Sequence, residues 1–305
     1  MTARQVARGI YGNAYVLLPA AALGWAGNSV VGRAVSGRVP PLGLSFWRWL
    51  LALAVIAPWG WPRVRADAAE LRRGGRVVVA LSCTGVAAFG TFLYLGLRTT
   101  TAINSAILQS IIPLLILLIA YASFGDRPGV PAMAGLALSL AGVLVVVTRG
   151  HPFDVAGTDF VTGDLWICLG VACYAVYSVV LRVRPKVHPL SLLTVTFALG
   201  TAVLLPAYAV EALTGPPMHL DAATLGAIGF TAAFPSLLSY FCFNRGVELV
   251  GAARAGQFIH LVPVFAVALA VVFLDERPAA FQAAGAAFVA VGIAVSGLPS
   301  ESVTQ

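Results

Sequence analysis

The sequence predicts an all-α polytopic membrane protein, with ten transmembrane helices arranged as two inverted-topology five-helix repeats around a central cavity. Three observations predict this fold. Of the 305 residues, 59% are hydrophobic and only 10% are charged, whereas a soluble domain carries about a quarter charged residues. Apolar runs of about 18 residues or more, each long enough to cross a bilayer, recur along the chain. The second half of the chain also repeats the first.

Ten apolar runs are predicted to span the membrane. In chain order they cover residues 13–33, 41–61, 77–97, 101–123, 129–148, 163–182, 189–210, 223–243, 250–274 and 279–297. The first run resembles a signal peptide, because Arg4 and Arg8 precede it and the alanines at 20–22 look like a cleavage site. We predict a membrane span instead, because this run takes part in the internal repeat.

The internal repeat has a period of about 150 residues. At an offset of 150 the matching residues are Asp126-Arg127-Pro128 with Glu276-Arg277-Pro278, Pro113 with Pro263, Gly96 with Gly246, Gly135 with Gly285, and Gly142 with Gly292. Earlier in each half the offset is 149, and Trp25, Ser29, Val30, Val31 and Arg33 match Tyr174, Ser178, Val179, Val180 and Arg182. We therefore predict a first repeat over 1–150, a polar linker over 151–163 and a second repeat over 164–305.

The odd number of spans in each half predicts that the halves enter the membrane from opposite sides, as in many secondary transporters. With a cytoplasmic N-terminus, 13 Lys and Arg residues fall on cytoplasmic segments and 5 on outer ones. This bias predicts a multi-pass protein of the cell (inner) membrane with both termini in the cytoplasm. The net charge of +7 is therefore a topology signal. Without a basic stripe interleaved with aromatics, it does not indicate nucleic-acid binding.

Several short motifs resemble a known family. Pro41 is followed seven residues later by Arg48, and Leu274 to Pro278 precedes a last span that contains Gly285 and Gly292. With ten spans and a duplication, the chain resembles the EamA-type transporters of the drug/metabolite transporter superfamily over nearly its whole length. Its layout and aromatic-rich spans are most similar to the bacterial amino-acid exporters of the YddG kind. The resemblance implies a cavity between the halves, alternating access, and export of amino acids, aromatic ones included, or of toxic cations.

Polar and aromatic side chains within spans are candidates for substrate binding, because a polar group in the bilayer must pair or face water. The candidates are Trp25, Asn28 and Ser29 in the first span, Tyr94 in the third, Gln109 in the fourth, Trp166, Tyr174, Tyr177 and Ser178 in the sixth, Asn244 after the eighth, and Gln257 and His260 in the ninth. The first-span residues share one helical face. The alternative is that these groups are interfacial aromatics and interhelical hydrogen bonds.

Arg48 has two interpretations. It lies seven residues from the outer end of its span, about 10 Å at the helical rise. It could extend to the lipid headgroups or cap a backbone carbonyl, which would be a structural role. It could instead bind a substrate carboxylate through its guanidinium fork.

The small residues predict how helices pack, and the positions of the acidic residues bear on the mode of transport. The glycines of the fifth and tenth spans predict a packing seam or a homodimer face, and the four cysteines are predicted to be small buried hydrophobes. None of the 12 acidic residues lies near the middle of a predicted span. The sequence therefore favours facilitated diffusion of the solute, or coupling to protons through His260.

The composition and motifs rank the classes of function. A solute exporter comes first, and its partners are a small-molecule substrate and the lipid bilayer. A carrier of a sugar phosphate or nucleotide sugar ranks lower, because Arg48 is the one cation that the spans offer. An intramembrane enzyme would need a nucleophile with a base, or a metal set, and the histidines have no paired acid. We therefore expect no catalytic residues, cofactor or metal. A purely structural protein also ranks low, because it would not require polar groups deep in both halves.

Overall fold

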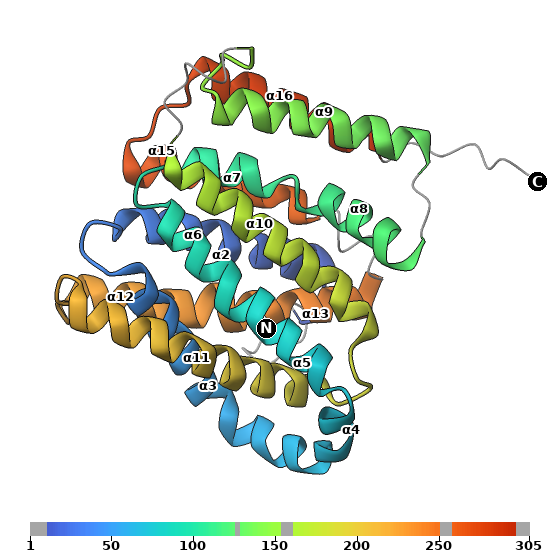
Figure 1. The fold of residues 1–305 in the computed structure, drawn as a ribbon, viewed down its shortest axis with the longest axis vertical. Helices are drawn as coiled ribbons and strands as arrows, with labels where there is room; N and C mark the ends of the chain where they lie inside the picture. Colours follow the sequence, from blue (N-terminus) through green and yellow to red (C-terminus); the bar gives the residue numbers. More distant parts are fainter. Residues whose placement is uncertain (1–10, 126–128, 154–160, 251–257, 297–305) are drawn as a thin grey trace, which may run out of the picture.

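A computed structural model describes residues 11–125, 129–153, 161–250 and 258–296, and every regular element in these ranges is helical (Figure 1). Eight helical runs are long and apolar enough to cross a membrane, and two shorter apolar helices cover 258–274 and 280–295. Each of the ten predicted spans coincides with one of them; residues 251–257 of the ninth span lie outside the described residues. The predicted all-α, ten-span membrane fold is confirmed.

The elements of the first half are α2 (Ala14–Ala34), α3 (Pro41–Ala66), α4 (Ala68–Arg73), α5 (Gly75–Leu81), the π-helix η1 (Ser82–Ala88), α6 (Phe89–Gly96), α7 (Ala102–Gln109), α8 (Ile112–Phe124) and α9 (Val130–Val147). Those of the second half are α10 (Thr162–Val180), the 3-10 helix η2 (Leu181–Val183), α11 (Pro189–Thr214), α12 (Ala222–Thr231), the π-helix η3 (Ala232–Leu238), α13 (Ser239–Val250), the 3-10 helix η4 (Phe258–His260), α15 (Leu261–Leu274) and α16 (Ala280–Ser296).

Irregular backbone recurs at equivalent places in the two halves. The π-helices η1 and η3 each have seven residues and lie 150 residues apart. The fourth span breaks between α7 and α8, just before Pro113, and the ninth changes from η4 to α15 just before Pro263. Proline lacks the N–H that a continuous helix needs. The repeat thus extends to the distortions of the helices, and π-helical turns are frequent at functional sites.

The helices pack as an inverted repeat predicts. The first helix of each half contacts the third and fourth spans of the other half: α2 packs on α13 and α15, and α10 packs on α6, α7 and α8. Two pairs of equivalent helices meet across the same axis, α3 with α11 and α9 with α16. In Figure 1 the α9–α16 pair lies along the top edge and the α3–α11 pair along the bottom. The candidate site must therefore lie among the helices between these pairs.

The seam between α9 and α16 is made by glycines. A Cβ on Gly142 would lie 2.7 Å from the carbonyl oxygen of Gly285, and one on Gly292 would lie 2.5 Å from that of Gly135. Any residue with a Cβ would clash at these positions, so only glycine allows the two helices to approach this closely. The predicted packing seam is therefore formed within the chain, rather than as a face for a second copy.

The loops gather at two ends of the molecule, left and right in Figure 1. We call the left end, with residues 35–40, 97–101, 148–153, 215–221 and 275–279, the linker end. The right end, with residues 67–74 and 184–188, is the basic end, because Arg72, Arg73, Arg184 and Lys186 lie there. The spans run between these ends, so each half crosses the molecule five times.

Candidate functional site

Arg48 of α3 lies at the centre of a buried polar group that joins three helices of the first half. Its side chain is only 4% exposed. The Nη1 group donates to Oδ1 of Asn28 on α2 (3.0 Å) and to the hydroxyl of Tyr94 on α6 (2.6 Å). The Tyr94 hydroxyl in turn donates to Oδ1 of Asn28 (2.7 Å). The interpretation that Arg48 extends to the lipid headgroups is therefore wrong, because its guanidinium is held inward by two neighbouring helices.

The charge of Arg48 has no anionic partner among the described residues. No carboxylate of the described ranges lies within 4.0 Å of it, and its buried Nε has no hydrogen-bond partner. The guanidinium carbon lies 4.4 Å from the centre of the Trp49 ring, whose face attracts a cation. Gly90 leaves it room, because a Cβ there would be 3.3 Å from Nη2. A buried cation balanced only by neutral groups is energetically costly, so this group is suited to receive an anion.

Beside Arg48 is an aromatic cluster, which consists of Trp25, Phe89, Tyr174, Tyr177 and Tyr240. Ring centres lie 6.2 Å apart for Trp25 and Tyr240, 4.8 Å for Phe89 and Tyr174, and 5.4 Å for Tyr174 and Tyr177. The cluster combines α2 and α6 of the first half with α10 and α13 of the second. It therefore lies at the interface between the two halves.

The π-helix η1 makes room for one member of this cluster. A Cβ at Gly85, in the middle of η1, would overlap the ring of Tyr177. The Tyr177 ring thus occupies the space that any larger residue at 85 would need. The position of Tyr177 depends directly on the backbone of the opposite half.

Electrostatic contacts connect Arg48 with the basic end through this cluster. Arg48 lies within electrostatic range of the Tyr240 hydroxyl. Tyr240 and Tyr177 interact through their hydroxyl groups, and the Tyr177 hydroxyl lies within range of Arg184. A series of cationic and hydroxyl groups therefore extends from the buried Arg48 to Arg184, directly after η2.

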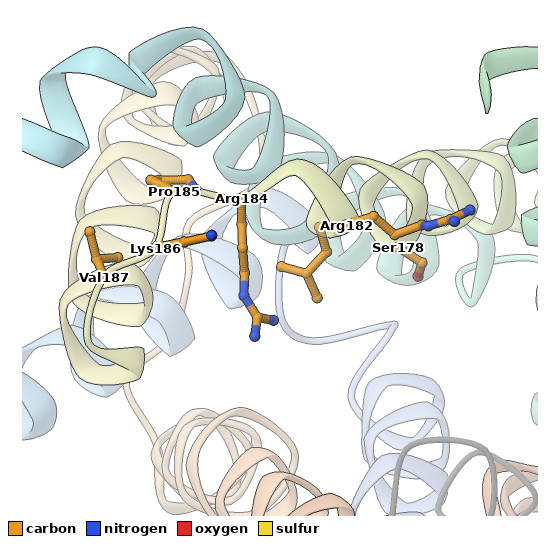
Figure 2. A pocket seen from close by; sticks show the side chains of 7 residues that line it. Ser178, Arg182, Arg184, Pro185, Lys186 and Val187 are labelled. Carbon is orange, nitrogen blue, oxygen red and sulfur yellow. The ribbon is translucent and has the colours of Figure 1, made fainter.

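A pocket of about 500 Å³ opens where this series reaches the basic end. It is lined by Ser178, Leu181, Arg182, Arg184, Pro185, Lys186 and Val187. Figure 2 shows Arg184 extending from η2 into the open space, with the Lys186 ammonium directed toward it and the Ser178 hydroxyl further along α10. The Arg182 guanidinium points away and lies 4.8 Å from the ring centre of Phe124. Two cationic groups, Arg184 and Lys186, are thus available to a ligand in this pocket.

The linker end is fastened by a buried polar network. Asp164, in the first turn of α10, is fully buried and accepts hydrogen bonds from the Thr100 hydroxyl and from Nδ2 of Asn104, at 3.3 Å to each oxygen. Oδ1 of Asn104 accepts from Nε2 of Gln282 (2.5 Å). These contacts tie α7, α10 and α16 together. Asp164 therefore joins the two halves at the linker end.

Two glutamates cap helix N-termini at the linker end. Glu276 accepts from the backbone N–H groups of Ala102 (2.9 Å) and Ile103 (3.1 Å) at the start of α7. Glu211, near the end of α11, accepts from Leu42 (3.2 Å) and Gly43 (2.7 Å) at the start of α3. A carboxylate is favourable there because it satisfies free N–H groups and complements the helix dipole. Each cap links one half to the other.

Asp67 makes the corresponding contact at the basic end. It follows α3 and accepts from the Ser191 hydroxyl (2.6 Å) and the backbone N–H of His188 (3.0 Å), where α11 begins. The Ser191 hydrogen bond, followed by that of His188, lowers the pKa of Asp67 below its ordinary value of 3.8. The antiparallel helices α3 and α11 thus cap each other's N-termini, Glu211 at one end and Asp67 at the other.

The structure brings together six of the predicted residues: Trp25, Asn28, Arg48, Tyr94, Tyr174 and Tyr177. Ser178 lines the basic-end pocket, although its hydroxyl donates to the backbone of Tyr174 (2.8 Å). Sequence reasoning missed Tyr240. The signal was available, because Tyr240 is four residues before the predicted Asn244 and shares its helical face.

Other predicted residues lie elsewhere. Ser29 accepts from Nε2 of Gln109 (3.2 Å), which is an interhelical contact between α2 and α7. Trp166 stacks on Phe92 and lines a pocket of about 280 Å³ at the linker end. His260 is half-buried at the change from η4 to α15. Gln257 and the side chain of Asn244 lie outside the described part of the chain, so their roles stay predictions.

Comparison with protein families gives one match that covers most of the chain. The model of a family described as the EamA-like transporter family matches residues 12–148 and again residues 161–298. The two matched segments correspond to the two halves of the structure, so the family unit occurs twice in this chain.

Relatives and solved structures agree with this match. An uncharacterized transporter of Bacillus subtilis, YyaM, is 30% identical over 84% of each chain. An uncharacterized transporter of Archaeoglobus fulgidus is 27% identical over 92% of this chain and 95% of its own. A probable terminal-alkyne amino-acid exporter of Streptantibioticus cattleyicolor is 25% identical over 80% and 78%. One crystal structure superposes with a TM-score of 0.62 at 21% identity, covering 96% of this chain and 99% of its own, which shows the shared fold.

Proposed function

Since the chain belongs to the EamA-like transporter family, we propose that it exports small organic solutes, amino acids above all, by alternating access between its two halves. A transport function follows from the family and from relatives described as transporters. The assignment to amino-acid exporters of the YddG kind is our proposal. It is supported by the similarity to an amino-acid exporter and by the chemistry of the interface between the halves.

The observation that carries the proposal is the buried, anion-free guanidinium of Arg48. Its neighbours Asn28 and Tyr94 are neutral, and its Nε has no partner among the described residues. A solute carboxylate bound there would neutralise the charge and accept charge-assisted hydrogen bonds. An α-carboxylate is common to all amino acids, so this contact would bind the class rather than one member.

The aromatic cluster suits the rest of an amino acid. The rings of Trp25 and Tyr240 offer apolar surface to a side chain, and aromatic faces attract an ammonium group. Residues of both halves meet here, so a movement of one half against the other would change the shape of the site. Such a site can face the two sides of a membrane in turn.

The basic end is the cytoplasmic end in this proposal. The excess of Lys and Arg on the segments at that end supports this orientation. Solute would then bind from the basic end and leave at the linker end across the inner membrane. The described spans place no carboxylate beside Arg48. Facilitated diffusion is therefore our proposed mode of transport, with proton coupling through His260 as the alternative.

Uptake of labelled amino acids into proteoliposomes tests this function. We expect saturable uptake of several amino acids, with KM raised about 10- to 100-fold by Arg48→Gln, because a hydrogen bond to a charged group contributes about 1.5–3 kcal/mol. Arg48→Lys keeps the charge but loses the fork and should lie between. Arg98→Gln, an exposed arginine at the linker end, is the control.

Other outcomes would redirect the proposal. Uptake of a sugar phosphate, a nucleotide sugar or a toxic cation, with no uptake of amino acids by folded protein, would replace amino acids by that substrate. Uptake that responds to an imposed pH gradient and loses this response in His260→Ala would replace facilitated diffusion by proton coupling.

A further inference from the structure

The basic-end pocket differs in charge from an ordinary cytoplasmic loop. Arg184 and Lys186 converge on a space of about 500 Å³, and neither Asp nor Glu is among its lining residues. Elsewhere at this end, basic and acidic residues are mixed: Arg73 pairs with Glu70 at 2.7 Å. Positive charge in a concave site focuses the potential and attracts anions.

The pocket lies next to the helix that carries part of the proposed substrate site. Ser178, which lines it, is one helical turn from Tyr174, and Arg184 acts electrostatically on Tyr177. Tyr177 and Tyr240 interact through their hydroxyls, and Tyr240 lies within electrostatic range of Arg48. The hydroxyl groups of Tyr177 and Tyr240 thus stand between Arg184 and Arg48 in this series of interactions. Among these residues there is no carboxylate to repel an anion.

We infer that the basic-end pocket is the first binding site for the solute, and that it selects solutes with a net negative charge, namely small carboxylates such as acidic amino acids. The inference rests on the proposed function and narrows its substrate class. Arg184 and Lys186 bind the anionic group first, and Arg48 binds it after passage along the hydroxyls of Tyr177 and Tyr240. A neutral zwitterion gains less from two cations than an anion does, because its ammonium group is repelled.

Glutamate and glutamine are the matched probes, since they have nearly the same shape and differ by one negative charge. We would measure the Kd of each for the purified protein by calorimetry, and the KM of each for uptake into phosphatidylcholine proteoliposomes. Wild type should prefer glutamate, and its preference should fall as salt screens the pocket. The double variant Arg184→Gln/Lys186→Gln should weaken glutamate binding about five-fold and leave glutamine unchanged.

Two control variants separate the pocket from a general effect of charge. Arg65→Gln/Arg72→Gln removes two exposed cations at the same end, outside the pocket lining, and should leave the glutamate preference intact. Arg184→Lys/Lys186→Arg keeps both charges and should restore it. A glutamate preference lost equally in both Gln variants would overturn the inference and reduce the pocket to a topology signal.

The two readouts distinguish this inference from the proposed function. Pocket-dependent glutamate binding without any flux would support the pocket and overturn transport of glutamate. Flux of glutamine equal to that of glutamate, unaffected by the pocket variants, would support amino-acid export and overturn the inference. If the variants changed only the dependence on added phosphatidylglycerol, the pocket would belong to a lipid headgroup, which would also overturn it.

Discussion

The two ends of the molecule are fastened in different ways. At the linker end, the fully buried Asp164 and the caps Glu276 and Glu211 join the halves. At the basic end, Asp67 ties α3 to α11, and beside it a pocket of about 500 Å³ exposes Arg184. Carboxylates link the halves at both ends, three of them at the linker end and Asp67 at the basic end, where cations also line a pocket. Under the proposed function, this difference would make the basic end the side from which solute binds, and release would then require the contacts of the linker end to break.

Removal of Asp164 should have the largest effect. In Asp164→Ala, the Thr100 hydroxyl and the Asn104 amide would lose a buried acceptor, and hydrogen bonds to charged groups contribute about 1.5–3 kcal/mol. We expect a loss of about 3 kcal/mol in stability, seen as a lower Tm in detergent. If the Tm stayed within a degree of wild type, the linker end would not be the more strongly fastened end.

Enlarging Gly85 should disturb the aromatic cluster instead. A methyl group in Gly85→Ala would displace the ring of Tyr177, and overpacking of this kind costs about 1–3 kcal/mol. We expect weaker substrate binding. We also expect a lower Tm, corresponding to a loss of about 2 kcal/mol in the free energy of unfolding. Gly226→Ala in α12 is the control, because nothing lies within 4 Å of a Cβ there. Equal binding by both variants would show that the aromatic cluster does not contact substrate.

The cap at the start of α7 should contribute less than Asp164. Glu276→Ala leaves the N–H groups of Ala102 and Ile103 without their acceptor, and loss of a helix cap costs about 1 kcal/mol. We also expect faster labelling of a cysteine introduced at the fully buried Ala102 by a membrane-impermeant maleimide, because the linker end would open more often. A labelling rate equal to that of wild type would mean that Glu276 stabilises α7 without closing the linker end.

The repeat made most of the fold predictable from sequence. The spans and the glycine seam follow from hydropathy and from an offset of 150 residues. The breaks before Pro113 and Pro263 were not predicted, although the same offset aligns the two prolines. The two π-helices were not predicted. Gly85 and Pro235 occupy the same repeat position and have opposite backbone freedom, so no shared residue marks the distortion. It depends on packing against the opposite half.

The site was predictable as a set of residues but not as a geometry. Asn28, Arg48 and Tyr94 were all candidates, yet their hydrogen bonds depend on the rotation of three helices. Asp164 shows that the burial of a side chain cannot always be predicted from sequence. The sequence places it only away from the middle of a span, whereas in the structure it is fully buried and bonded to Thr100 and Asn104 of the other half. Hydropathy cannot predict that a residue is buried by partners that are distant in the chain.

The smallest expected effect is the change in stability when the Asp67 carboxylate is protonated at low pH. It tests whether the charge of Asp67 stabilises the contact between α3 and α11 at the basic end. Because its hydrogen bonds lower its pKa below 3.8, the ionised form stabilises the fold at every pH above its unfolded value, and this contribution is lost as pH falls through the lower folded value. Asp67→Asn should therefore have a lower Tm than wild type at pH 7, and the difference in Tm should narrow as pH falls below about pH 4. A gap that stayed unchanged from pH 7 down to about pH 2 would mean that the charge of Asp67 does not stabilise the basic end, and the contrast between the two ends would then reduce to the charge of the pocket.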